Sequence, residues 1–126
     1  MIEKFIAEVP ERIWAEGRPP KLRQWESHFN LASWVRISGG IGDVSLSLRW
    51  RDEKGEHDQR VDLAQASGDG SVLLSGMIRL RFNGPVEGVT VVLGLADPAM
   101  RYVVDELYMQ RCGGLQSAGN KLISNY

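Results

Sequence analysis

Apolar and polar residues alternate along most of the chain from Glu26 onward. In residues 29–37, one face carries Phe29, Leu31, Ser33, Val35 and Ile37, and the other carries Asn30, Ala32, Trp34 and Arg36. Residues 44–51 repeat the pattern. A period of two is the signature of a β-strand, because successive side chains point to opposite faces of a sheet. The alternation predicts antiparallel sheets with one face in the core and the other in water.

Short polar or glycine-containing stretches separate six segments of this kind. The predicted strands lie within residues 29–37, 44–51, 61–63, 72–82, 89–95 and 101–111. The polar stretch "RDEKGEH" joins the second strand to the third, so residues 43–62 are predicted to form a hairpin. Because no helical period lies between the strands, the pattern predicts an all-β fold, either a β-sandwich or a barrel.

The two ends of the chain differ from this pattern. Apolar residues near the N-terminus are spaced by three and four, as in an amphipathic helix: Ile2, Phe5, Ile6, Val9 and Ile13. Pro10 interrupts the spacing, which leaves three forms open: a short helix ending near Val9, a helix starting near Pro10, or a bent arm. We expect this arm or short helix in residues 1–25, the β-sandwich in residues 26–111 and a loose tail in residues 112–126.

Composition narrows the class of protein. A chain of 126 residues with 43% hydrophobic and 25% charged residues suits one globular domain. The net charge of −1 provides no overall field that would attract nucleic acid. The sequence shows neither a secretory signal nor an apolar run long enough to span a membrane, and its single cysteine, Cys112, suits a reducing compartment. We therefore expect a cytoplasmic location, with no nucleic-acid and no membrane partner.

Four segments of the chain resemble those of a known family when they are taken in order. They are "LASWVRISGG", "VSLSLRWRDEKGE", "VLLSGMIRL" and "RYVVDELYM". Together they resemble the carbohydrate-binding modules of the galactose-binding-like jelly-roll class, over about residues 31–111. The resemblance implies a jelly-roll β-sandwich without catalytic activity and a carbohydrate partner. It also implies a structural calcium ion near the last of these strands, as in some members of the family.

The polar phase of the predicted strands supplies candidate ligand-binding residues. They are Trp34, Arg36, Arg79, Arg81, Tyr102 and Tyr108. Sugar sites need flat aromatic rings against the apolar face of a pyranose, so Trp34 and Tyr108 are the leading candidates. The alternative is a protein-interaction or structural domain, in which the N-terminal segment or another subunit covers the same face. Both readings remain open at the level of sequence.

Arginines recur at alternating strand positions. They are Arg36, Arg49, Arg51, Arg79 and Arg81. Such a stripe can bind an anionic polysaccharide or phosphate through forked hydrogen bonds. The alternative is cross-strand pairing with the 16 Asp and Glu residues of the chain.

Asp105 is the candidate metal ligand. If Val103, Leu107 and Met109 face the core, the period of two places Asp105 on the core side and Glu106 in solvent. A buried carboxylate needs backbone amides, an arginine or a cation as its partner. Calcium, which the family resemblance implies, is the only cofactor expected.

Catalytic patterns are absent from the sequence. His28 and His57 lie in different segments, and neither G-x-S-x-G nor H-E-x-x-H occurs. Asp105 and Glu106 would point to opposite faces of one strand, so they cannot converge on a single glycosidic bond. We therefore expect a protein that is not an enzyme.

Overall fold

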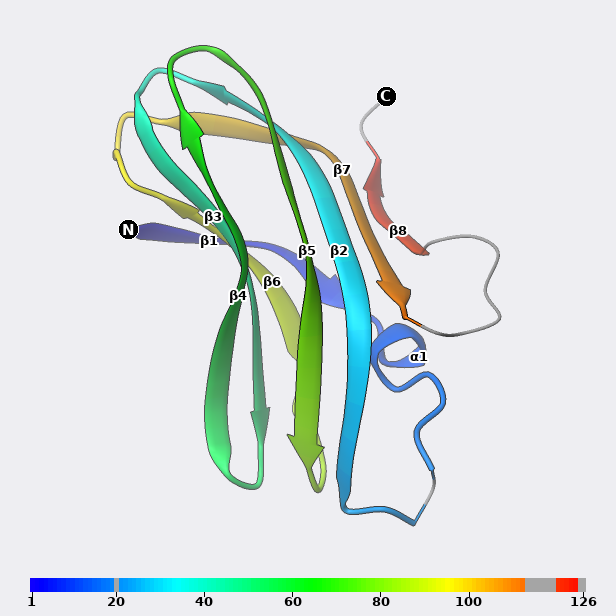
Figure 1. Ribbon diagram of the computed structural model, residues 1–126. Helices are drawn as coiled ribbons and strands as arrows, with labels where there is room; N and C mark the ends of the chain where they lie inside the picture. Colours follow the sequence, from blue (N-terminus) through cyan, green and yellow to red (C-terminus); the bar gives the residue numbers. More distant parts are fainter. Residues whose placement is uncertain (20, 113–119, 125–126) are drawn as a thin grey trace.

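The computed structural model describes residues 1–19, 21–112 and 120–124, and shows a sandwich of two antiparallel β-sheets (Figure 1). The elements are β1 (Ile2–Val9), α1 (Glu11–Trp14), β2 (Gln24–Ser38), β3 (Gly42–Asp52), β4 (Gly55–Ala66), β5 (Gly70–Asn83), β6 (Val89–Leu95), β7 (Arg101–Arg111) and β8 (Asn120–Ser124). The all-β prediction is therefore confirmed. Among the described residues, no helix has the length and apolar character that crossing a bilayer demands.

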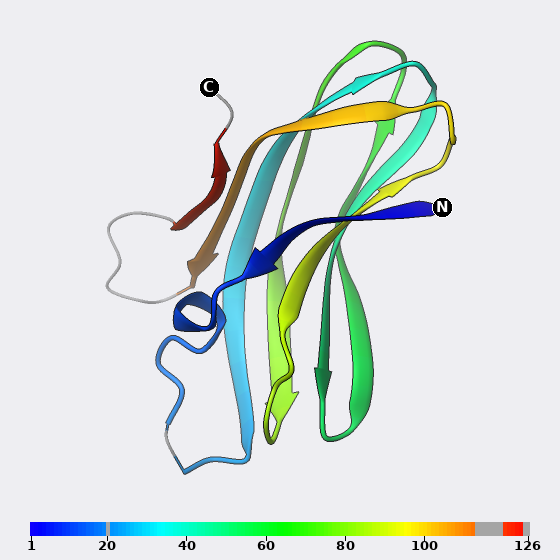
Figure 2. The same cartoon turned by 180° about the vertical axis from the view of Figure 1, so that it is seen from behind.

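The two sheets have the strand orders β1-β6-β3-β4 and β5-β2-β7-β8. Figure 1 looks onto the second sheet, and Figure 2 shows β1 and β6 of the first sheet from behind. Strand β2 pairs with β7, and β3 pairs with β6, so the second pair lies between the members of the first along the chain. Nested pairing of this kind is typical of a jelly roll. The β3–β4 hairpin lies where the sequence predicts it.

The core lies between the sheets and is built from the apolar phase of each strand. Along β2, buried and less buried positions alternate, and Phe29, Leu31 and Val35 are almost completely buried. Near one end of the core, Phe82 packs against the rings of Trp14, Trp25 and Trp50. Burial of each large apolar side chain contributes about 1.5–3 kcal/mol to the free energy of folding. Burial of the apolar phase of the strands therefore provides most of the driving force for folding.

The N-terminal segment is mainly a strand. Residues 2–9 form β1, which pairs with β6 at the edge of the first sheet, so a helix in these residues was the wrong form. Pairing with β6 outweighs the helical spacing, and a register shift between Phe5 and Ala7 breaks the strict alternation that would have indicated a strand. The short helix α1 begins at Glu11, directly after Pro10, which agrees with one of the three predicted forms.

The C-terminal tail is partly ordered into the sandwich. Residues 120–124 form β8, which pairs with β7 and extends the second sheet, so a loose tail is wrong for this part. The rest of the predicted tail, except Cys112, lies outside the described residues. The alternation of apolar and polar residues that would indicate this strand is weak, because β8 is only five residues long.

Candidate functional site

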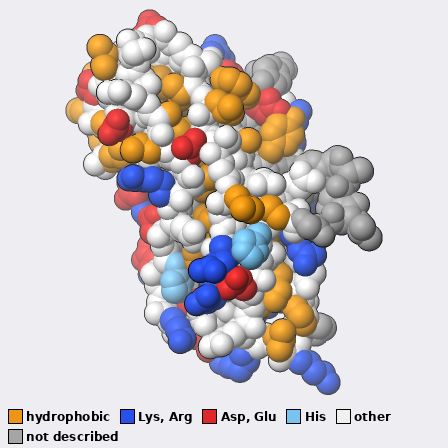
Figure 3. All heavy atoms as spheres, in the orientation of Figure 1, with side chains coloured by type: hydrophobic (Ala, Val, Ile, Leu, Met, Phe, Trp, Pro, Cys, Tyr) orange, Lys and Arg blue, Asp and Glu red, His pale blue; other side chains and the backbone are white. Residues whose placement is uncertain are grey.

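The outer face of the sheet β5-β2-β7-β8 carries an exposed tryptophan. The Trp34 side chain belongs to β2 and is 43% exposed, while its neighbours in the ladder are Leu73 of β5 and Glu106 of β7. Leu73, Met77 and Val103 are also exposed large apolar residues of this sheet. Figure 3 shows apolar side chains gathered over the upper part of this face. The N-terminal segment, which lies in the other sheet, leaves Trp34 accessible.

Tyr108 lies next to Trp34 on the same face. It pairs with Ala32, so Trp34 is its diagonal neighbour across the ladder. Diagonal neighbours in an antiparallel pair lie about 7–8 Å apart, within reach of aromatic side chains. The ammonium group of Lys121 lies 5.3 Å from the centre of the Tyr108 ring. One side of this ring therefore already has a cation–π partner, and Trp34 offers the freer aromatic surface.

A β-bulge in β7 changes which residues of this strand face the core. Trp34 pairs with Glu106 and Val35 pairs with Val104, so Asp105 is an extra residue between two regular pairs. As a result, Val104 is buried at 6% exposure and Val103 is 42% exposed. The prediction that Val103 and Asp105 face the core and Val104 faces solvent is wrong. The prediction is wrong because it assumed strict alternation along residues 101–111, whereas the ladder contains one additional residue at this point.

Asp105 lies on the outer face and forms an ion pair with Arg36. Arg36 Nε lies 2.8 Å from Oδ2 and 3.1 Å from Oδ1 of Asp105, and Nη2 lies 2.9 Å from Oδ1. These hydrogen bonds and the carboxylate charge raise the pKa of Arg36 above its ordinary value. An arginine is therefore the partner of this carboxylate. The part of the chain that the structure describes contains no group of three or more His, Cys, Asp or Glu residues arranged to hold a metal ion.

A large open hollow, here called the upper hollow, begins at Arg36, two residues along β2 from Trp34. It has a volume of about 790 Å³ and is lined by Lys4, Arg36, Ile37, Ser38, Asp69, Gly70, Ser71, Met100, Arg101, Tyr102 and Val103. Arg36 belongs to the outer face two positions beyond Trp34, so it joins the tryptophan surface to the hollow. Apolar groups supply most of the wall and cationic groups lie among them, a combination typical of ligand sites.

Tyr102 lines the upper hollow but does not share the face of Trp34. It pairs with Ile37, a core residue, and its partly buried side chain packs against the core. The bulge places Tyr102 on the same side as Val104, so its predicted outward orientation is wrong. Sequence reasoning also missed Lys4 and Met100, because the strand pairing that brings them to the hollow leaves no local signal.

Arg79 and Arg81 are separate from the tryptophan surface. They pair with His28 and Glu26 of β2, and His28 is six residues from Trp34. At about 3.3 Å per residue, Arg79 therefore lies roughly 20 Å from Trp34 along the strand. Figure 3 shows basic, acidic and histidine side chains together on this lower part of the face. The structure brings together Trp34, Arg36 and Tyr108, with Tyr102 in the adjoining hollow, and excludes the two remaining arginines.

Comparison with known proteins assigns neither a family nor a function to this chain. No protein-family model, curated protein or solved structure matches this chain. The function is therefore inferred from the geometry of the molecule.

Proposed function

We propose that this protein is a non-catalytic module that binds a carbohydrate on the outer face of the sheet β5-β2-β7-β8. The observation that carries the proposal is the exposed ring of Trp34, two residues along β2 from Arg36, which lines the upper hollow. A buried aromatic ring would serve only the core, whereas an exposed one at the centre of a sheet offers a flat apolar surface to a ligand. A pyranose presents a matching apolar face.

Polar groups around Trp34 suit the hydroxyl and acidic groups of a sugar. Arg36 is held in place by Asp105, which leaves its remaining N–H groups for a ligand. Lys4 and Arg101 also line the upper hollow, and neither forms an ion pair with any residue in the described ranges. Their positive charge favours a glycan that carries carboxylate or sulfate groups over a neutral one.

Replacement of Trp34 tests the proposal. Binding to a panel of neutral and acidic oligosaccharides is measured by calorimetry for the native protein and for Trp34→Ala. We expect the native protein to bind at least one acidic glycan and Trp34→Ala to bind it at least about tenfold more weakly, since aromatic stacking is lost. Phe5→Ala is the matched control, because Phe5 is an exposed aromatic residue of the other sheet. The proposal fails if no glycan binds or if both variants bind equally.

A second candidate function is protein association through the same face. The observation that favours it is the presence of Leu73, Met77 and Val103, exposed aliphatic side chains that a sugar site does not require. Such side chains commonly mark surfaces where proteins meet. If the face joins two copies of the chain, light scattering will show a mass that rises with concentration, and iodide will quench Trp34 less at high concentration. A constant mass with full quenching would argue against self-association.

A further inference from the structure

A second hollow, here called the lower hollow, lies between the edge strands β4 and β5. It has a volume of about 500 Å³, and its lining includes Trp50, His57, Gln59, Arg79, Arg81 and Asn83. The described residues that line it include no serine, threonine or cysteine. The lining is rich in hydrogen-bond donors. This hollow accounts for the two arginines that the tryptophan surface does not include.

The arginines of the lower hollow are only partly neutralised. Glu26 pairs with both of them, at 3.1 Å from Arg81 Nη2 and 3.7 Å from Arg79 Nε. The side chains of Arg79 and Arg81 are 56% and 63% exposed, so both can reach a ligand. Two guanidinium groups therefore share one carboxylate.

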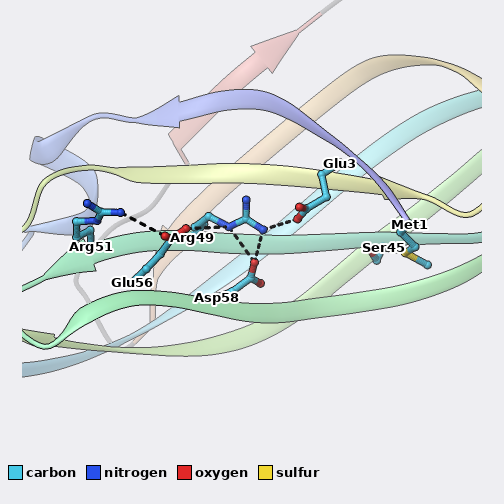
Figure 4. Close-up of polar contacts among 7 residues, drawn as sticks. All are labelled: Met1, Glu3, Ser45, Arg49, Arg51, Glu56 and Asp58. Atoms are coloured by element: carbon cyan, nitrogen blue, oxygen red, sulfur yellow. Dashed lines mark hydrogen bonds and ion pairs between the residues drawn. The ribbon is translucent and has the colours of Figure 1, made fainter.

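The acidic residues of the lining already have partners. Glu56 and Asp58 also border the lower hollow, but both pair with Arg49, which lies on the outer face of the other sheet (Figure 4). Arg51 forms a further pair with Glu56. Glu56 and Asp58 thus form their ion pairs with Arg49 and Arg51, and Glu26 is the carboxylate that pairs with Arg79 and Arg81 among the described residues.

His57 is held in the wall of the lower hollow by a buried carboxylate. Its Nε2 lies 2.9 Å from Oδ1 of Asp52, and its ring stacks on Trp50 with 5.1 Å between the ring centres. Asp52 also accepts hydrogen bonds from the backbone N–H groups of Lys54 and Asn83. Since Nε2 donates to Asp52, Nδ1 of the neutral ring is an acceptor, and it donates to an anion only when the ring is protonated.

Trp50 supplies the observation that points to a ligand. Its indole N–H is buried and has no hydrogen-bond partner within the described part of the protein. A buried donor without an acceptor is unfavourable and uncommon in folded proteins. Trp50 belongs to the wall of the lower hollow, so the proposed ligand would be bound next to the residue that carries this unpaired donor.

We infer that the lower hollow binds an oxyanion, namely a sulfate or phosphate group. Forked guanidinium groups match the oxygens of such an anion, and Arg79 and Arg81 supply two of them beside His57 and Trp50. The group is either a free ion or a substituent of an acidic saccharide. The site lies roughly 20 Å from Trp34 by the strand spacing, so it is distinct from the proposed glycan surface and does not depend on it.

Titration with inorganic sulfate and, separately, inorganic phosphate tests this site. The indole N–H signals of Trp50 and Trp34 and the ring signals of His57 are followed by NMR, with chloride at equal ionic strength as the reference. We expect saturable shifts at Trp50 and His57 and none at Trp34. We expect R79Q/R81Q to weaken the apparent affinity at least about tenfold through loss of charge-assisted hydrogen bonds. The control R12Q/R23Q removes the same charge from exposed positions elsewhere.

The titration distinguishes a specific site from general screening, and a free ion from a substituent of a saccharide. Shifts that grow without saturation, or that are equal in the two double variants, would reduce the effect to general screening and overturn the site. A sulfated oligosaccharide that binds more tightly than free sulfate identifies a saccharide substituent as the source, whereas equal affinities identify the free ion. Trp34→Ala should leave sulfate binding unchanged, so failure of the glycan proposal is distinguishable from failure of this one.

Discussion

At the scale of single residues, Asp52 is the most completely enclosed charge described in the protein. Its side chain has no exposed area and accepts hydrogen bonds from His57, from the backbone of Lys54, and from the backbone and side chain of Asn83. Burial alone would raise the pKa of Asp52, but these hydrogen bonds outweigh it, so the pKa lies below the ordinary value of 3.8. The carboxylate joins β3, β4 and β5 around the lower hollow.

Asp52→Asn removes the charge and turns an N–H₂ group toward other donors. We expect a loss of about 2–3 kcal/mol in the free energy of unfolding, because hydrogen bonds to a charged acceptor are lost and buried donors remain unpaired. Urea denaturation measures the change. Asp69→Asn is the control, since Asp69 is exposed and accepts a hydrogen bond from the backbone N–H group of Gly39. Equal effects of the two substitutions would show that the buried network contributes little.

The same carboxylate gives a pH dependence with a definite sign. Because the folded pKa is lowered, its stabilisation is fully present above the ordinary value of 3.8 and is lost as the pH falls through the folded pKa. The native protein should therefore lose stability over this acidic range more steeply than Asp52→Asn. Parallel pH profiles of the two proteins would contradict the lowered pKa.

At the scale of elements, the β-bulge in β7 adds one residue, Asp105, to an otherwise regular alternation of faces. Asp105 is the additional residue, so its deletion leaves Val104 opposite Val35 and Glu106 opposite Trp34. Each remaining residue then keeps its face. The bulge thus adjusts the bend of the strand and supplies the partner of Arg36 without setting the register of the rest.

Deletion of single residues from β7 tests this reading. We expect the variant without Asp105 to unfold cooperatively in urea, with reduced stability. Deletion of Tyr108, which lies in a regular part of the β2–β7 ladder, should abolish cooperative unfolding, because Leu107 and Met109 can no longer both face the core. If both deletions are equally disruptive, the bulge itself is required for folding.

At the scale of the whole molecule, the two sheets approach each other where β4 crosses β5. A Cβ atom on Gly76 would lie 2.7 Å from the carbonyl oxygen of Val61, and Asp62 accepts a hydrogen bond from the backbone of Ser75 at the same place. The absence of a side chain at position 76 therefore permits this close approach. This contact closes the upper part of the β4–β5 side, while the lower hollow occupies the lower part.

Gly76→Ala should force the two strands apart. We expect it to lower the free energy of unfolding by about 1–3 kcal/mol, the usual cost of overpacking. Ser75→Ala is the neighbouring control, because the Ser75 side chain is exposed. Urea denaturation of both variants measures the difference, and an unchanged midpoint for Gly76→Ala would show that the crossing relaxes easily.

Much of the architecture follows from the sequence, because strand alternation is a local property. The period of two in residues 29–37 and 44–51 predicts both the strands and their buried faces, and an all-β fold follows from the repetition of such segments. The exposed position of Trp34 could also be predicted, since it falls between core residues of a regular strand. Trp34 and Arg36 could be placed on one face because the alternation of buried and less buried positions along β2 is unbroken.

The remaining features of the fold and of the candidate site were decided by the tertiary structure alone. The bulge at Asp105, the strand in residues 2–9 and the separation of Arg79 and Arg81 from Trp34 all depend on which strands pair and in what register. The grouping of Asp52, His57 and Asn83 depends on contacts between distant segments. Local alternation determines which residues share a face of one strand, but the free energy of long-range pairing and packing determines which faces meet.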